Sequence, residues 1–320
     1  MFPTKTLLAV DGSPESTRAG QIAGRLSSKL GSELHLVSVG AMLEGYTPWD
    51  WKVLDASSLS RVRQPAEEEA KATLEKQTQK LREEGAEVAE AHVKTGRPAV
   101  EIVRLAEELD AGLVILGSRG FGSLKRALLG SVSYGVVCHA HASVLVVRGE
   151  EEDHPWGKVL LTVDGSREAA AAAKAAVEIS GASGSELHVL SVLRLPYPGP
   201  GMWDVSGERL ERAKRDLRAF AERPAGREKA KGSRVEEVHL AFGNPDKEIV
   251  ALGERLDVGL VVIGSRGLGG ARRALLGSVS GSVVRHAHCS VLVVRGAGKQ
   301  SGVGSEGSRL LSETDEPPEA

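Results

Sequence analysis

The sequence predicts an α/β fold of two tandem Rossmann-like domains, each a five-stranded parallel sheet of order 3-2-1-4-5 with helices on both faces. The first observation is the alternation of strand-like and helix-like stretches along each half. Short apolar runs without polar alternation, such as residues 7–10 and 113–116, suit strands that are covered on both faces. Strands separated by helices form parallel sheets with right-handed crossovers.

The second observation is an internal repeat. Residues 5–13 recur as 158–166, displaced by 153 positions, and residues 96–149 match 243–296, displaced by 147. A chain of 320 residues is long enough for two such domains. We therefore predict domains at residues 1–150 and 151–296, and a disordered tail at residues 297–320, where large apolar residues are few.

The first half begins with a strand, residues 7–10, that ends in Asp11-Gly12-Ser13-Pro14. Ser13 is predicted as the N-cap and Pro14 as the first residue of a helix that stops at Gly31. Residues 34–39 are predicted as the second strand and 40–62 as a long loop with Tyr46, Trp49 and Trp51. An amphipathic helix follows, with one apolar stripe made of Ala66, Ala70, Leu74 and Leu81.

The remaining elements of the first half are a third strand near residues 87–93, a helix opened by Pro98, a fourth strand, a helix beginning near Ser131 and a last strand at 144–147. The second half repeats this order over residues 159–294. Its second helix is expected at about 208–221, followed by a solvated basic loop at 227–234.

Composition excludes several classes of protein. A formal net charge of −2 provides no general attraction for nucleic acid or an anionic membrane surface. No run of eighteen apolar residues and no secretion signal is present, so a cytoplasmic location is expected. Cys138 and Cys289 are not at equivalent positions of the two copies, and we expect them to be free thiols.

A glycine motif follows the fourth strand of each half. Gly117-Ser118-Arg119-Gly120 is followed after nine residues by Gly130-Ser131, and Gly264-Ser265-Arg266-Gly267 is followed in the same way by Gly277-Ser278. Without a Cβ, backbone amides can approach an anion closely, and a helix N-terminus favours negative charge. A tight turn would explain one glycine pair, but the third glycine and the serine favour a phosphate site. The dinucleotide fingerprint and the Gly-Lys-Ser/Thr phosphate loop do not fit.

The spacing Gly-x2-Gly-x9-Gly-Ser, with Val-Asp-Gly-Ser upstream, resembles the ATP-binding class of the universal stress protein family. The resemblance covers residues 4–149 and 157–296 and implies a tandem member that binds ATP with magnesium. It places the adenine and ribose contacts of the first half at Ala9, Val10, Asp11, Val39 and Leu116. It places the phosphate contacts at Gly117, Arg119, Gly120, Gly130, Ser131, Val132 and Ser133. The equivalent positions of the second half are Thr162, Val163, Asp164, Val192, Ile263, Gly264, Arg266, Gly267, Gly277, Ser278, Val279 and Ser280.

The resemblance also implies that the two domains pair through their last strands, residues 144–147 against 291–294, which would cover two sheet edges. Two departures from the family are visible. Ser143 and Ser290 stand where the family often has Pro, and Tyr134-Gly135 in the first copy corresponds to Gly281-Ser282 in the second. The second departure leads us to expect pockets of different affinity.

Some polar residues have two interpretations. Asp11 and Asp164 are candidates for a ribose hydroxyl or a magnesium-bound water, although a helix cap is the simpler role. Arg126, Arg272 and Arg273 are explained as well by a solvated helix face and are left out of the site. The pairs His139/His141 and His286/His288 fit a turn better than a metal site. Trp49, Trp51 and Trp203 are candidates for a roof over the nucleotide or for loop packing.

The sequence thus predicts a cytoplasmic stress-response protein that holds ATP and magnesium in each half and acts mainly through its nucleotide-bound state. A slow ATPase or nucleotidyl-transfer enzyme is the second hypothesis; no catalytic residue is assigned and the metal ligands are unknown. A third, a module that acts by dimer contacts alone, is disfavoured by the intact glycines. The physiological stress, the protein partner, site occupancy and a further homodimer stay open.

Overall fold

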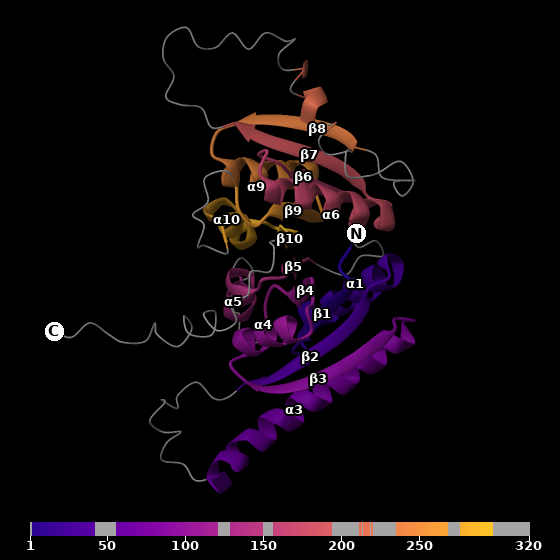
Figure 1. Cartoon of the computed structure of the whole chain (residues 1–320), viewed down its shortest axis with the longest axis vertical. Coiled ribbons are helices and arrows are strands. Elements are labelled where there is room, and N and C mark those ends of the chain that lie inside the picture. Colours follow the sequence, from indigo (N-terminus) through magenta and orange to yellow (C-terminus); the bar gives the residue numbers. More distant parts are fainter. Residues whose placement is uncertain are drawn as a thin grey trace, which may run out of the picture.

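Ten strands form one sheet in the order β3-β2-β1-β4-β5-β10-β9-β6-β7-β8 (Figure 1). Within each half all neighbouring strands are parallel, in the predicted order 3-2-1-4-5. The computed structural model describes residues 2–41, 56–120, 129–149, 156–193, 211–212, 214–217, 219, 235–267 and 276–296. Several predicted features lie outside these residues: Tyr46, Trp49, Trp51, Trp203, Arg126, Arg272, Arg273, the basic loop 227–234 and the tail 297–320.

The strands of the first half are β1 (Lys5–Val10), β2 (Glu33–Ala41), β3 (Val88–Gly96), β4 (Leu113–Gly117) and β5 (Ser143–Val147). Those of the second half are β6 (Lys158–Thr162), β7 (Glu186–Leu193), β8 (Val235–Phe242), β9 (Leu260–Gly264) and β10 (Ser290–Val294). The helices of the described residues include α1 (Pro14–Leu30), α3 (Ala56–Glu83), α4 (Pro98–Glu108), α5 (Ser131–His139), α6 (Arg167–Ser183), α9 (Pro245–Leu256) and α10 (Ser278–His286).

Helix α1 has the predicted ends. The Ser13 hydroxyl accepts a hydrogen bond from the amide of Ser16, which satisfies one of the first-turn amides. Gly31 ends the helix with φ of 67°, a left-handed conformation in which a Cβ is unfavourable. Helix α6 is built in the same way, with Ser166 and Gly184 at its ends. The local signals therefore suffice to position the helix that follows the first strand of each half.

Two sequence expectations about α3 and β3 were wrong. Helix α3 begins at Ala56, so the predicted loop 40–62 is too long, and the helix contains Pro65 in its interior. Strand β3 runs to Gly96, beyond the predicted residue 93, because β2 continues to Ala41 and pairs with it there.

The core consists of two apolar layers, one on each face of the sheet. Successive side chains of the central strands point to opposite faces: Leu8 of β1 packs in the layer beneath α1, whereas Leu7 packs in the layer beneath α4 and α5. Each layer continues into the second half, through Leu161 and Leu160 respectively. Burial on both faces explains why these strands are uninterrupted apolar runs.

The two halves join edge to edge through β5 and β10, at the centre of Figure 1. These strands are antiparallel, with Val144 opposite Val293 and Val146 opposite Val291, and all four side chains are buried. The predicted pairing of the last strands is confirmed. An edge strand presents unpaired amides and carbonyls, so this ladder removes one exposed edge from each half.

Polar groups extend the ladder at both ends. The Ser290 hydroxyl accepts from the Arg148 amide at 3.1 Å and donates to its carbonyl at 3.3 Å, while the Ser143 hydroxyl accepts from the Arg295 amide at 3.1 Å. These are the two serines at which the sequence departs from the family pattern that it resembles. The Arg295 guanidinium crosses to the Val137 carbonyl in α5 at 2.6 Å, and burial lowers the pKa of Arg295 to about 10. The serines thus act at the junction of the halves.

Candidate functional site

A cavity opens at the carboxyl ends of the strands in each half. Because β1 and β4 are neighbours in the sheet, the turn after β1 and the glycine loop after β4 face the same space, as the sequence predicts. The first cavity has a volume of about 640 Å³ and the second about 490 Å³. Both volumes lie within the range of small-molecule sites.

Every residue predicted for the site lines the cavity of its own half. In the first half these are Ala9, Val10, Asp11, Val39, Leu116, Gly117, Arg119, Gly120, Gly130, Ser131, Val132 and Ser133. In the second they are Thr162, Val163, Asp164, Val192, Ile263, Gly264, Arg266, Gly267, Gly277, Ser278, Val279 and Ser280. Residues far apart in the chain are brought together because the motif residues follow strands that end at one edge of the sheet.

The sequence interpretation missed part of the apolar lining. Val37 on β2 and Ile102 on α4 join Val39 and Leu116 to form an apolar wall in the first cavity. Leu190 and Ile249 take the equivalent places in the second. Val37 was detectable from sequence, because it lies two residues before Val39 and therefore points to the same face of the strand. Such a wall suits a flat, largely apolar ring.

Asp11 has a local structural role as well as a place in the cavity. Its Oδ1 accepts hydrogen bonds from the amide of Ser13 at 3.0 Å and from the Ser13 hydroxyl at 2.6 Å. In the second half, Asp164 Oδ1 accepts from the amide of Ser166 at 2.9 Å. The carboxylate therefore orients the N-cap serine rather than capping the helix itself. Asp11 is exposed, and its second oxygen lies beside Gly120.

The glycines of the motif have different physical reasons. A Cβ on Gly117 would lie 2.9 Å from the backbone of Glu15, so this glycine allows α1 to pack against the end of β4. A Cβ on Gly120 would collide with the Asp11 carboxylate, and one on Gly267 would collide with Asp164. Gly120 and Gly267 therefore keep the loop close to the aspartate on the cavity wall, a reason that the sequence did not reveal.

Helix α5 points its N-terminus at the first cavity. Its N-cap is Gly130, which has no side chain to accept hydrogen bonds from the first-turn amides. The N-cap of α10, Gly277, likewise leaves the first-turn amides of that helix without a side-chain partner. The Ser133 hydroxyl donates to the Gly117 carbonyl at 2.8 Å and so ties the helix to the strand end. Amides at an uncapped helix start, together with the helix dipole, favour an anionic ligand.

The motif arginines are paired with glutamates of the first helix. Arg119 lies 2.9 Å from Glu15 on α1, and Arg266 lies 3.0 Å from Glu168 on α6. Both glutamates occupy the first turn of their helices, where negative charge is favoured by the dipole. Each arginine is thereby held against the cavity wall. The glutamates repeat in sequence, and this duplication was the signal that could have identified them.

The two cavities differ in volume, but the residues that line them differ at other positions than the ones singled out from the sequence. Tyr134, Gly135, Gly281 and Ser282 do not appear in the lining of either cavity. Instead the Arg285 guanidinium lies 5.3 Å from the centre of the Tyr134 ring, a contact between the halves. Thr162 and Leu190 replace the smaller Ala9 and Val37, in agreement with the smaller second cavity.

The first histidine of each predicted pair contacts a backbone carbonyl of its own helix. His139 Nδ1 lies 2.8 Å from the Gly135 carbonyl, and His286 Nδ1 lies 2.8 Å from the Ser282 carbonyl, both at helix ends. Neither pair belongs to a cluster of three metal-ligating side chains within the described part of the chain. Both cysteines are free, and burial raises the pKa of Cys289 to about 12. His139 and His286 are the last residues of α5 and α10, and His141 and His288 lie between these helices and the last strands.

No helix among the described residues combines the length and the apolar character that a membrane crossing needs.

The chain matches the model of the universal stress protein family twice, over residues 3–148 and 155–295. It is 32% identical, over 300 residues, to a universal stress protein of Mycolicibacterium smegmatis, covering 90% of this chain and 96% of the relative. A Bacillus subtilis universal stress protein, YxiE, is 33% identical over 146 residues, which cover 45% of this chain and 98% of the relative.

Among solved structures, a universal stress protein from Archaeoglobus fulgidus has 27% identity and a TM-score of 0.61, and the match covers 91% of this chain and 96% of that one. A Pseudomonas aeruginosa protein with 20% identity and a TM-score of 0.63 shares the fold. The chain therefore belongs to the universal stress protein family and contains the family's domain twice in tandem.

Proposed function

We propose that each half binds one ATP molecule together with magnesium, and that the protein acts as a cytoplasmic stress-response factor mainly through its nucleotide-bound state. The domains that bind would be residues 1–150 and 151–296. The observation that supports this most strongly is the duplicated cavity, in which an apolar wall, an aspartate and an uncapped helix start face one space.

The residues fit each part of the nucleotide. The adenine would lie on the wall formed by Val37, Val39 and Leu116, and Asp11 would accept a hydrogen bond from a ribose hydroxyl or from a magnesium-bound water. The phosphates would bind the first-turn amides of α5, which Gly130 leaves without a capping side chain. Arg119 would add a positive charge at the rim once it releases Glu15.

A slow ATPase or nucleotidyl-transfer activity is the alternative. Phosphoryl transfer needs a positioned water or nucleophile and charges on the leaving group. Among the described residues that line the first cavity, the charged side chains are Asp11 and Arg119. Arg119 is positioned to stabilise negative charge, and Asp11 already accepts two hydrogen bonds from Ser13. We therefore favour ATP binding without rapid hydrolysis over an enzymatic function.

The test is isothermal titration of the full-length protein with ATP and magnesium, after mass spectrometry of any nucleotide released on denaturation. The informative variant is Gly130→Asp with Gly277→Asp. Both glycines have extended N-cap conformations that are open to aspartate, and the new Cβ would lie 3.2 Å from the carbonyl of Ser118 or Ser265, which must shift slightly. The new carboxylates would then cap the helix and occupy the first-turn amides. At about 4 Å, repulsion between unit charges is about 4 kcal/mol at an effective dielectric of 20.

The matched control is Ala72→Glu with Gln79→Glu, which adds two negative charges at exposed positions of α3. We expect the parent and the control to bind two ATP and the glycine variant to lose binding at both sites. If the parent shows no affinity at millimolar ATP with magnesium, the proposal fails. Phosphate release that is unchanged in the glycine variant would remove the cavities from any catalytic account.

A further inference from the structure

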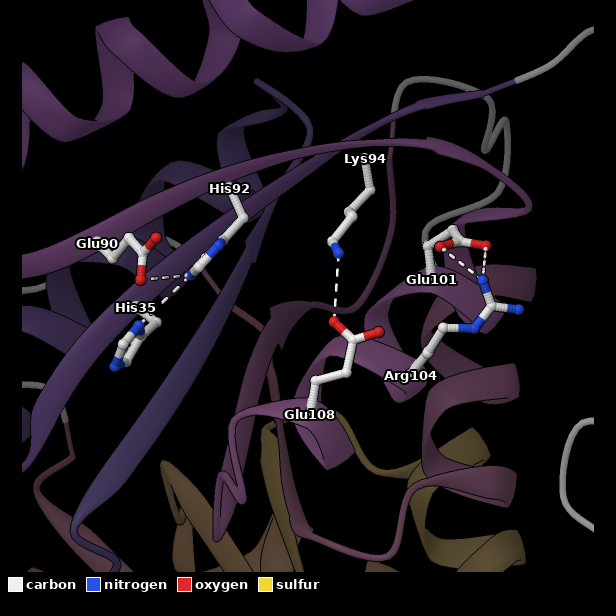
Figure 2. A network of polar contacts seen from close by, with 7 residues as sticks. All are labelled: His35, Glu90, His92, Lys94, Glu101, Arg104 and Glu108. Carbon is white, nitrogen blue, oxygen red and sulfur yellow. Dashed lines mark hydrogen bonds and ion pairs between the residues drawn. The ribbon is translucent and has the colours of Figure 1, made fainter. Parts of the chain in front are cut away.

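A second polar cluster lies on β2 and β3, away from the cavities. Glu33 and His35 are two residues apart on β2, and Glu90 and His92 are two residues apart on β3, so each pair points to one face of its strand. His35 Nδ1 lies 3.4 Å from His92 Nε2, and His92 Nε2 lies 3.7 Å from a Glu90 carboxylate oxygen (Figure 2). Three ligand-bearing side chains thus meet at one point.

The backbone places these residues opposite one another. The β2–β3 pairing contains an irregularity after Leu34, so that His35 pairs with Glu90 rather than with Ala89. Bulges of this kind re-aim side chains. Lys94, two residues beyond His92, reaches Glu108 of α4 at 3.3 Å, which places the cluster on the face of the sheet that α4 covers (Figure 2).

The second half contains the same arrangement. His188 Nδ1 lies 3.3 Å from His239 Nε2, which lies 3.7 Å from a Glu237 oxygen. The irregularity recurs after Leu187, and His188 pairs with Glu237 in the register. In each half the His, Glu and His ligand atoms all lie within 4.8 Å of one another. Both copies keep all three side chains and the irregularity, although neighbouring positions such as Ala91 and Lys94 are replaced by Val238 and Ala241 in the second copy.

Two buried imidazole nitrogens lack a hydrogen-bond partner. The side chains of His35 and His188 are 7% and 6% exposed, and the Nε2 of each makes no hydrogen bond. A buried polar atom without a partner carries a free-energy cost that needs an explanation. The Glu33 carboxylate lies 3.8 Å from His35 Nε2, and the Glu186 carboxylate lies 3.7 Å from His188 Nε2. Each carboxylate is close to hydrogen-bond distance without reaching it.

We propose that each of these clusters is a binding site for one divalent metal ion of the zinc type, with His35, His92 and Glu90 as ligands in the first half and His188, His239 and Glu237 in the second. Ligands at 2.0–2.1 Å from a tetrahedral zinc ion lie about 3.3 Å apart. The observed separations of 3.4 and 3.7 Å in one half, and 3.3 and 3.7 Å in the other, are close to that value, and the remaining ligand pair of each half lies within 4.8 Å, so the carboxylate must move toward the first histidine when the ion binds.

The ligand types favour zinc over magnesium. Two imidazoles and one carboxylate match the donor sets of zinc and related transition metals, whereas magnesium prefers oxygen ligands. Three protein ligands leave a fourth position for water. Once His35 Nδ1 binds the ion, its Nε2 must carry the proton and can donate a hydrogen bond, for which the Glu33 carboxylate 3.8 Å away is the acceptor; such an arrangement is common around metal-bound histidines. Metal binding would therefore explain why the buried Nε2 of His35 faces a carboxylate.

The site is separate from the nucleotide cavities. None of the six ligands lines either cavity, and the nearest cavity residue on β2 is Val37, two positions beyond His35. Metal binding can therefore be measured without nucleotide. Because β3 and β8 are the outermost strands of the sheet, an ion at each place would link an outer strand to its inner neighbour and stabilise the two ends of the sheet.

The experiment is titration of untagged, metal-free, full-length protein with Zn²⁺ alone, followed by calorimetry and by metal analysis after dialysis. We expect two ions per chain. His92→Ala or His239→Ala should remove one ion each, and the double variant should retain none. The control is His141→Ala with His288→Ala, which removes two exposed histidines and should still bind two ions.

A second set of variants covers the case in which a histidine variant fails to fold. Glu90→Gln and Glu237→Gln are nearly isosteric at exposed positions and should weaken Zn²⁺ binding at least about 100-fold, since loss of an outer hydrogen-bond partner alone costs about 10- to 100-fold. Glu33→Gln should fall within that smaller range. Co²⁺ in place of zinc should give the visible absorption of a tetrahedral site. The proposal is overturned if the parent binds no Zn²⁺, or if the cluster variants bind as many ions as the control; the histidines would then only hydrogen-bond to each other.

Discussion

Replacing Asp11 and Asp164 with alanine should weaken ATP binding much more than it destabilises the fold. Asp11 makes two hydrogen bonds, both to Ser13 in the adjoining turn, and it is exposed. Loss of these local contacts should cost about 1 kcal/mol per site, equivalent to a fall in melting temperature of about 2–4 °C. A hydrogen bond from the ligand to a charged carboxylate contributes about 1.5–3 kcal/mol, so affinity should fall roughly 10- to 150-fold.

A control variant distinguishes the effect of a weakened helix N-terminus on binding from the effect of a lost contact between the aspartate and the nucleotide. Ser13→Ala with Ser166→Ala removes the N-cap hydroxyls, which accept from Ser16 and Ala169, and should lower stability by about 1 kcal/mol. It leaves the aspartate carboxylates in the cavities. Calorimetric titration with ATP and magnesium, together with thermal unfolding, should therefore rank the aspartate variant as the weaker binder of the two at similar stability.

A third variant distinguishes the two roles proposed for the carboxylate. Asp11→Asn keeps an oxygen that can accept from Ser13 and from a ribose hydroxyl, but it loses the charge that favours a magnesium-bound water. Near-parental affinity would indicate the ribose, and a loss that depends on magnesium would indicate the metal. If Ser13→Ala weakens binding as much as Asp11→Ala, or if Asp11→Ala binds as the parent does, the assigned contact is refuted.

Three further outcomes are expected. Glu15→Gln should raise affinity for ATP several-fold in the first half, because it removes a negative charge from the site and releases Arg119; unchanged or lower affinity in calorimetry would contradict this. Ser290→Ala should lower the free energy of unfolding by about 1–3 kcal/mol in denaturant titration, since it leaves the Arg148 amide without its partner, and a neutral result would show that water replaces the hydroxyl. Cys289 should resist alkylation in the folded protein at pH 8, and its contribution to stability should be lost as pH rises from about 9 to about 12, because the thiol ionises first in the unfolded chain; rapid labelling of Cys289 at pH 8 would contradict its burial.

Local sequence was sufficient to predict the tandem family domain and most element ends. Every residue that it assigned to a cavity lines that cavity in the structure. Ser13 and Gly31 define a helix because capping acts within a few residues. The motif glycines and Asp11 could be assigned to one place because the ends of parallel strands meet at one edge of a sheet, whatever the details of packing. Whether those residues bind a nucleotide stays a prediction.

The tertiary structure decided what depends on contacts between distant segments. Glu15 reaches Arg119, and Gly117 must be small, only because α1 packs on the end of β4. His35 meets His92 only because the β2–β3 register skips one residue, and no local pattern encodes that register. Propensity and periodicity act over a few residues, whereas strand order, register and helix packing join residues that the chain separates by tens of positions.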